Sequence, residues 1–101
     1  MVTQIIVDLE NAACELALRP YREGLSLRAE TRGAIERAAR DQGGLPLRSV
    51  ACTLAEARDL YDYFWSAADI FTTLGDSTAM VYARARDSAG RALDVAGERR
   101  R

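Results

Sequence analysis

The feature that most constrains this chain is a run of apolar residues at helical spacing between residues 54 and 74. These side chains recur every three or four positions: Leu54, Ala57, Leu60, Tyr61, Phe64, Ala67, Ala68, Phe71 and Leu74. A stripe this wide must be buried, so it predicts a long amphipathic helix at the centre of a core. Thr53 followed by Glu56 is a capping box that marks the helix start, and Gly75 marks its end.

A further helix is predicted over residues 77–96, with Asp76 as its N-cap. One side carries mostly small apolar residues: Tyr82, Ala85, Ala89, Ala92, Leu93 and Ala96. The other side carries charges of alternating sign, which we interpret as weak stabilisation within the helix: Arg84, Asp87, Arg91 and Asp94. The short link at Gly75 and Asp76 predicts that the two helices form an antiparallel hairpin.

Residues 42–46 contain two glycines and a proline, which end any helix and divide the chain into two halves. Each half begins with a short extended run rich in β-branched or small residues, at residues 3–7 and 49–52. Helices are predicted over residues 10–19 and 27–41 in the first half.

The ends of these two helices have identifiable signals in the sequence. Asp8 is the predicted N-cap of the first helix, and Pro20 is predicted to end or kink it. Gly24 suits the turn that follows, and Ser26 is the predicted N-cap of the second helix.

Together these elements predict a mainly α fold in a single domain, residues 1–101: four helices in two hairpins with two short strands. The strands pair either within the chain or across a dimer. The parts are a strand-helix-helix half at residues 1–41, a strand with a long helical hairpin at 47–97, and a basic tail at 98–101. A homodimer is expected, because the apolar strand and its flanking aromatics exceed what one copy of these thin helices covers.

Composition argues against catalysis. The chain has no histidine, so the commonest general base is missing. Cys14 and Cys52 lie among small apolar residues, which predicts buried thiols and neither a disulfide nor a metal site. Asp59, Asp62 and Asp69 share a helix face opposite the apolar stripe, and we interpret them as its solvated side. We therefore expect no enzyme activity, cofactor, metal or small-molecule substrate.

The sequence also bears on location and charge. No apolar run reaches the ~18 residues that a membrane span needs, and the N-terminus lacks the order of a signal peptide, so a cytoplasmic protein without membrane contact is expected. All fourteen basic residues are arginine, against fifteen acidic residues, for a net charge of −1. A globally basic surface for nucleic acid is therefore missing.

Two aromatic residues lie at the edges of the long apolar stripe. Tyr63 and Trp65 flank it, and aromatic residues in such positions are typical anchors of a protein interface. The alternative, in which both pack at the edge of the chain's own core, is equally open. With the strand residues Ile5 and Val7, they are the candidate interface residues.

Residues 5–40 resemble the ribbon-helix-helix family of bacterial DNA-binding regulators, particularly its antitoxin members. The run Ile5-Ile6-Val7-Asp8-Leu9 lies where that family has its strand. Gly24 and Ser26 stand where family members end the first helix and begin the second, and Ala29-Glu30 followed by Arg32 leads into the packing face. The resemblance covers about two fifths of the chain.

This resemblance implies a dimer whose paired strands enter the DNA major groove. Thr3 and Gln4 would then belong to the strand that reads base edges, and Ser26 and Arg28 would lie where the second helix meets a phosphate. The leading hypothesis is thus a non-catalytic regulator or antitoxin of this type. The alternative is a small helical protein–protein interaction module, an adaptor or inhibitor, that binds no nucleic acid.

Overall fold

The computed structural model describes residues 4–19 and 25–97. Its elements are, in chain order, β1 (Ile5–Glu10), α1 (Asn11–Leu18), α2 (Ala29–Gln42), β2 (Leu47–Cys52), α3 (Leu54–Thr73) and α4 (Ala79–Val95). The predicted fold class is confirmed: within these residues the chain is mainly helical, with four helices and one two-stranded antiparallel sheet. The predicted Pro20 helix end, the Gly24 turn, Thr3 and the tail at 98–101 lie outside the described residues.

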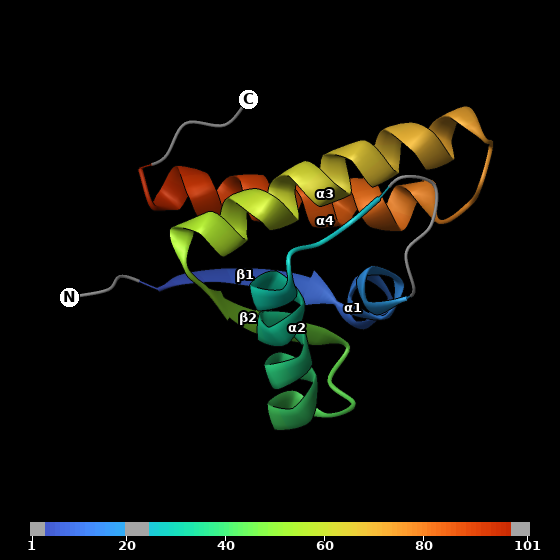
Figure 1. Cartoon of the computed structure of the whole chain (residues 1–101). Coiled ribbons are helices and arrows are strands. Elements are labelled where there is room, and N and C mark those ends of the chain that lie inside the picture. The colour runs from blue at the N-terminus through green and yellow to red at the C-terminus, as the bar shows by residue number, and fades with distance from the viewer. Residues whose placement is uncertain (1–3, 20–24, 98–101) are drawn as a thin grey trace.

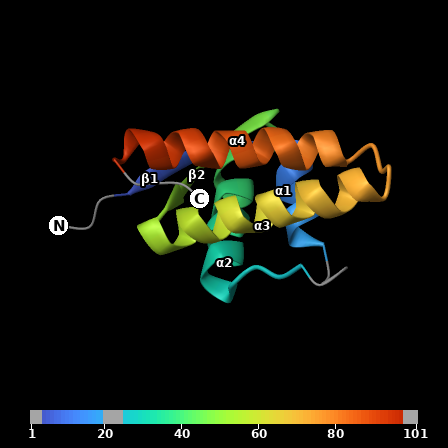
Figure 2. The same cartoon turned by 90° about the horizontal axis from the view of Figure 1, so that it is seen from above.

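The helices α3 and α4 lie side by side as a hairpin, which forms one layer above the sheet (Figure 1). Seen from above, α2 runs across the direction of this hairpin (Figure 2). The short helix α1 continues directly from β1 and lies beyond the end of that strand. The core therefore lies between the hairpin and the inner face of the sheet.

The two strands pair within the chain, which decides between the two alternatives left open by the sequence. Pairing runs from Ile5 opposite Cys52 to Glu10 opposite Leu47. Both strands are longer than predicted, because the pairing continues to Glu10 in β1 and Leu47 in β2. The predicted N-cap at Asp8 is therefore wrong: Asp8 lies inside β1, and its carboxylate accepts a hydrogen bond of 2.8 Å from the Ser49 hydroxyl.

Within residues 4–19 and 25–97, only one face of the sheet is covered. Val7, Leu9 and Val50 point into the core and are fully buried, whereas Ile6 and Asp8, which alternate with them, face outward. This alternation is typical of an antiparallel sheet with one solvated face.

The long helix α3 follows the sequence prediction closely. Both bonds of the predicted capping box are present: the Glu56 N–H donates to the Thr53 hydroxyl at 3.2 Å, and the Thr53 N–H donates to the Glu56 carboxylate at 2.9 Å. The predicted stop at Gly75 is confirmed by its left-handed φ of 70°. Phe64 is fully buried, and Phe71 stacks on Tyr82 of α4 with ring centroids 5.1 Å apart.

The start of α4 differs slightly from the prediction. Its N-cap is Thr78, with no side-chain hydrogen bond to the helix, and not Asp76. The Asp76 carboxylate instead accepts hydrogen bonds from the N–H and the hydroxyl of Thr78, at 2.8 and 2.6 Å. Asp76 thus orders the turn that enters the helix.

Side chains of other helices cap the N-terminus of α2 and the C-terminus of α1. The Asp59 carboxylate of α3 accepts hydrogen bonds from the Arg28 N–H, at 3.0 Å, and from the buried Thr31 hydroxyl, at 2.7 Å. The predicted cap at Ser26 is wrong, since the N-cap position is Arg28 and no side chain of the local sequence fills it. The Arg32 guanidinium donates to the Leu18 carbonyl at the end of α1, at 3.0 Å.

This contact revises the interpretation of the acidic face of α3. Asp62 and Asp69 are exposed as expected, but Asp59 is half-buried and joins α3 to the N-terminus of α2. A carboxylate near the N-terminus of a helix is also favoured by the helix dipole. Asp59 therefore stabilises the packing between the two halves of the chain.

We expect Phe64→Ala to lower the free energy of unfolding by about 3–5 kcal/mol, because it leaves a cavity in the centre of the core. Asp69→Ala, on the exposed side of the same helix, is the matched control and should change stability by less than about 0.5 kcal/mol. Urea unfolding followed by circular dichroism measures both. A larger loss of stability for Asp69→Ala than for Phe64→Ala would mean that the buried and exposed sides of α3 are wrongly assigned.

We expect Asp59→Ala to lower the free energy of unfolding by about 1–2 kcal/mol, the usual cost of a lost helix N-cap. Ser26→Ala should have almost no effect, because Ser26 does not cap α2. Hydrogen exchange of the amides in the first turn of α2 would report the effect locally. Slower exchange in Ser26→Ala than in Asp59→Ala is expected, and the reverse order would contradict the assignment of the cap.

Candidate functional site

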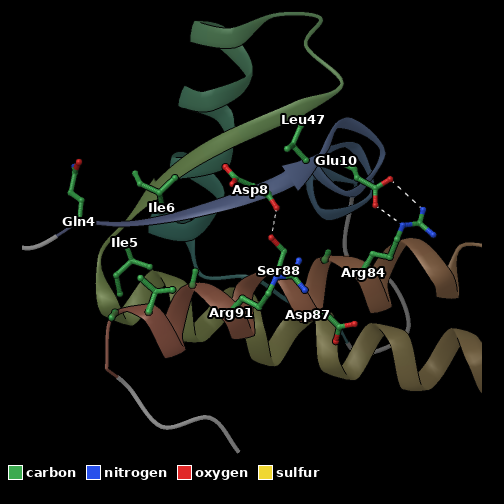
Figure 3. Close-up of a pocket in the computed structure, with 14 residues that line it drawn as sticks. Gln4, Ile5, Ile6, Asp8, Glu10, Leu47, Arg84, Asp87, Ser88 and Arg91 are labelled. Carbon is green, nitrogen blue, oxygen red and sulfur yellow. Dashed lines mark hydrogen bonds and ion pairs between the residues drawn. The ribbon is translucent and has the colours of Figure 1, made fainter.

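A groove of about 980 Å³ lies between the outer side of β1 and the exposed side of α4. We call it the β1–α4 groove; Figure 3 shows the residues that line it. Three large apolar side chains border it and are strongly exposed: Ile6 at 51%, Leu47 at 52% and Val95 at 90%. Small residues of α4, among them Ala92, line it between these side chains.

Hydrogen bonds between β1 and α4 hold the walls of the groove at a fixed spacing. The Ser88 hydroxyl of α4 donates to the Asp8 carbonyl oxygen of β1 (Figure 3). Farther along, the Arg84 guanidinium binds both oxygens of the Glu10 carboxylate, at 2.6 and 3.2 Å. The groove is therefore an ordered part of the fold.

Side chains also occupy part of each free edge of the sheet. Gln42 binds the N–H and the carbonyl oxygen of Ser49 on the outer edge of β2, at 2.8 and 2.7 Å. Ser88 binds the edge of β1 at Asp8. Because edge strands with free backbone groups invite pairing with another chain, these bonds disfavour strand addition at both positions. The groove thus offers mainly side chains to a partner.

The charged residues around the groove are largely paired. Glu10 binds Arg84, and Asp87 accepts a hydrogen bond from Arg86 at 3.1 Å. Arg91 makes no hydrogen bond or ion pair with any of the residues that the structure describes. The hydrogen bond from Arg84 lowers the pKa of the Glu10 carboxyl below its ordinary value; partial loss of water opposes this shift, and the positive charge of Arg84 adds to it.

The residues of the DNA-binding hypothesis do not lie together at a free helix end. Gln4 lines the β1–α4 groove, while Ser26 and Arg28 precede α2 and are exposed. The Arg28 N–H, a natural phosphate donor at this helix start, already donates to the Asp59 carboxylate. A phosphate at this position would meet a negative charge.

The structure separates the four candidate interface residues. Ile5 and Val7 are buried in the chain's own core, so a partner could contact Val7 only if the fold opened. Tyr63 is half-buried and packs edge-on against Phe64 and Tyr82, with centroids 5.3 and 6.4 Å apart. Trp65 is 38% exposed on α3 and does not line the groove.

Both cysteines are buried and free, as predicted. Burial raises the pKa of the Cys52 thiol to about 12, and burial also raises that of Cys14, against the opposing charge of Arg48. Both thiols are therefore protonated at neutral pH. Among the described residues, no group of three or more metal-ligating side chains lies together, and no helix is long and apolar enough to cross a membrane.

Comparisons of the chain with known protein families, with curated proteins and with solved structures gave no match.

Sequence reasoning missed Ile6, Leu47 and Val95. In the run Ile5-Ile6-Val7 every residue is apolar, so period-two alternation could not tell the buried set from the exposed one. The alternating charges that begin at Arg84 were the available signal for the α4 side of the groove. The sequence alone indicates contacts within the helix, whereas in the structure Arg84 binds Glu10 of β1.

We expect the Glu10–Arg84 pair to make stability depend weakly on pH. Because the pKa of Glu10 is lowered in the folded state, its stabilisation is present above the ordinary carboxyl pKa of 4.5 and is lost as the pH falls through the folded-state value. Urea unfolding at about pH 7 and about pH 3, compared between the wild type and Glu10→Gln, measures this. The difference in the free energy of unfolding between the two proteins should be smaller at the acidic pH than at the neutral pH. A difference that grows in acid would contradict the assignment.

Proposed function

We propose that this chain is a non-catalytic protein-binding module and that the β1–α4 groove is the surface that contacts its partner. The observation that carries this proposal is the exposure of Ile6, Leu47 and Val95 around one groove. Isolated exposed apolar side chains are normal on a protein surface, but several gathered around one concave site are typical of interaction sites.

The polar groups of the groove support a protein partner over a small ligand. Pockets for small molecules usually aim a few polar groups at the ligand. Here Glu10 and Arg84 bind each other, and Ser88 binds the backbone of β1. The surface that remains available to a partner is apolar with a charged rim, which is the usual composition of a protein–protein interface.

Charge favours a protein partner over DNA as well. The net charge is −1, and the groove carries the carboxylates of Asp8, Glu10 and Asp87. Binding to the phosphate backbone depends on several phosphates being neutralised by Arg or Lys, and acidic groups in the contact surface oppose it. The carboxylate of Asp59 at the N-terminus of α2 acts in the same direction.

Photo-crosslinking in cells of the natural host tests this function. A photoreactive amino acid at position 6 should give a discrete protein adduct, which mass spectrometry identifies, and the same group at position 36 on α2 should not. Leu47→Asp should reduce the adduct at position 6 about tenfold, because it places a charge in an apolar contact.

Two outcomes would contradict the proposal. One is the absence of any specific adduct at position 6 in the folded protein. The other is retardation of duplex DNA at low salt that is lost in Arg28→Ala, which would support the DNA-binding hypothesis instead.

A further inference from the structure

We propose that the partner in the β1–α4 groove is a second copy of this chain, docked so that the two α4 helices lie antiparallel. The two-fold axis would pass at the level of Ala89. This inference rests on the proposed function and names the partner of the same surface.

The order of charges along α4 carries the inference. Arg84, Asp87, Arg91 and Asp94 alternate in sign, and reading the series backwards inverts every sign. A two-fold interface places residue i against j and j against i. About an axis at Ala89, Asp87 meets Arg91 of the second copy, and Arg91 meets Asp87 of the second copy. The same axis brings Arg84 level with Asp94 of the second copy.

The partners already present at Asp87 and Arg91, the central pair, fit this arrangement. Arg91 is exposed and makes no ion pair with the residues that the structure describes, so it is available to a second chain. Asp87 is held by Arg86 through one carboxylate oxygen, Oδ1, and its side chain is 53% exposed.

The exposed apolar residues lie at opposite ends of the groove. Val95 is near the C-terminal end of α4. Leu47 is at the other end, since it pairs with Glu10, which in turn binds Arg84. An antiparallel second copy brings Val95 of each chain to the Leu47 end of the other. The two-fold axis thereby generates the same apolar contact, Val95 near Leu47, twice in the dimer.

The size of the surface predicts a weak dimer. The 17 residues of α4 span about 25 Å. A face of that length and about one helix and one strand wide buries on the order of 1,000 Å² in total, the lower limit for a specific interface. The small side chains of Ser88 and Ala92 allow close approach of the second helix. We expect a dissociation constant on the order of 10 micromolar.

A charge swap tests the arrangement by sedimentation equilibrium of the full chain. Asp87→Arg and Arg91→Asp should each weaken self-association by about tenfold or more, because the two-fold axis doubles every like-charge contact. The double variant Asp87→Arg with Arg91→Asp should restore it, since each new arginine again meets an aspartate. Asp69→Arg on α3 is the control of matched charge and should associate like the wild type. Circular dichroism confirms that each variant is folded.

The outcomes separate this inference from the function on which it rests. Wild-type protein that stays monomeric at about 100 micromolar, about tenfold above the expected dissociation constant, contradicts the proposal that the partner is a second copy. A crosslinked adduct with a different protein would then leave the proposed binding function standing. A wild-type dimer that single reversals do not weaken, or that the double variant does not restore, overturns the antiparallel arrangement. An adduct at position 6 that contains two copies of this chain supports both.

Discussion

The antiparallel pairing of β1 with β2 is the contact on which the rest of the structure depends. It joins residues some forty positions apart, at the beginnings of the two halves of the chain. Because α1 follows β1 directly and α3 follows β2 after Thr53 alone, the register of the pair fixes where both helices start. The buried face of the pair, with Val7, Leu9 and Val50, then provides the surface against which the helices pack.

Covering only one face of a two-stranded sheet has a direct consequence for function. No element in the described part of the chain forms a layer over the outward residues of β1 and β2, and α4 runs beside β1 without covering them. Ile6 and Leu47 therefore remain half-exposed beside Val95, and the bonds of Ser88 and Arg84 to β1 keep the groove between them ordered. The surface that we propose for binding follows from how the core is built.

The helical hairpin and the boundaries of α3 were predictable, because their signals are local. The stripe around Phe64, the capping box at Thr53 and the stop at Gly75 each involve residues within a few positions of one another. The site was not predictable in the same way. Ile6, Leu47 and Val95 come from three separate elements, and the three apolar residues at positions 5–7 are equally suited to either face. Only the strand register assigns Val7 to the core and Ile6 to the surface.

By itself, then, the sequence determined the helical character of the chain, the extent of α3 and α4, the burial of the thiols and the lack of a histidine-based site. The tertiary structure alone decided which side chains cap α1 and α2, which strand pairs with which, and which apolar residues stay exposed. The physical reason is the range of the interactions. Periodicity and capping act within one or two turns, whereas Asp59 reaches Arg28 and Arg84 reaches Glu10 only after distant segments have packed together.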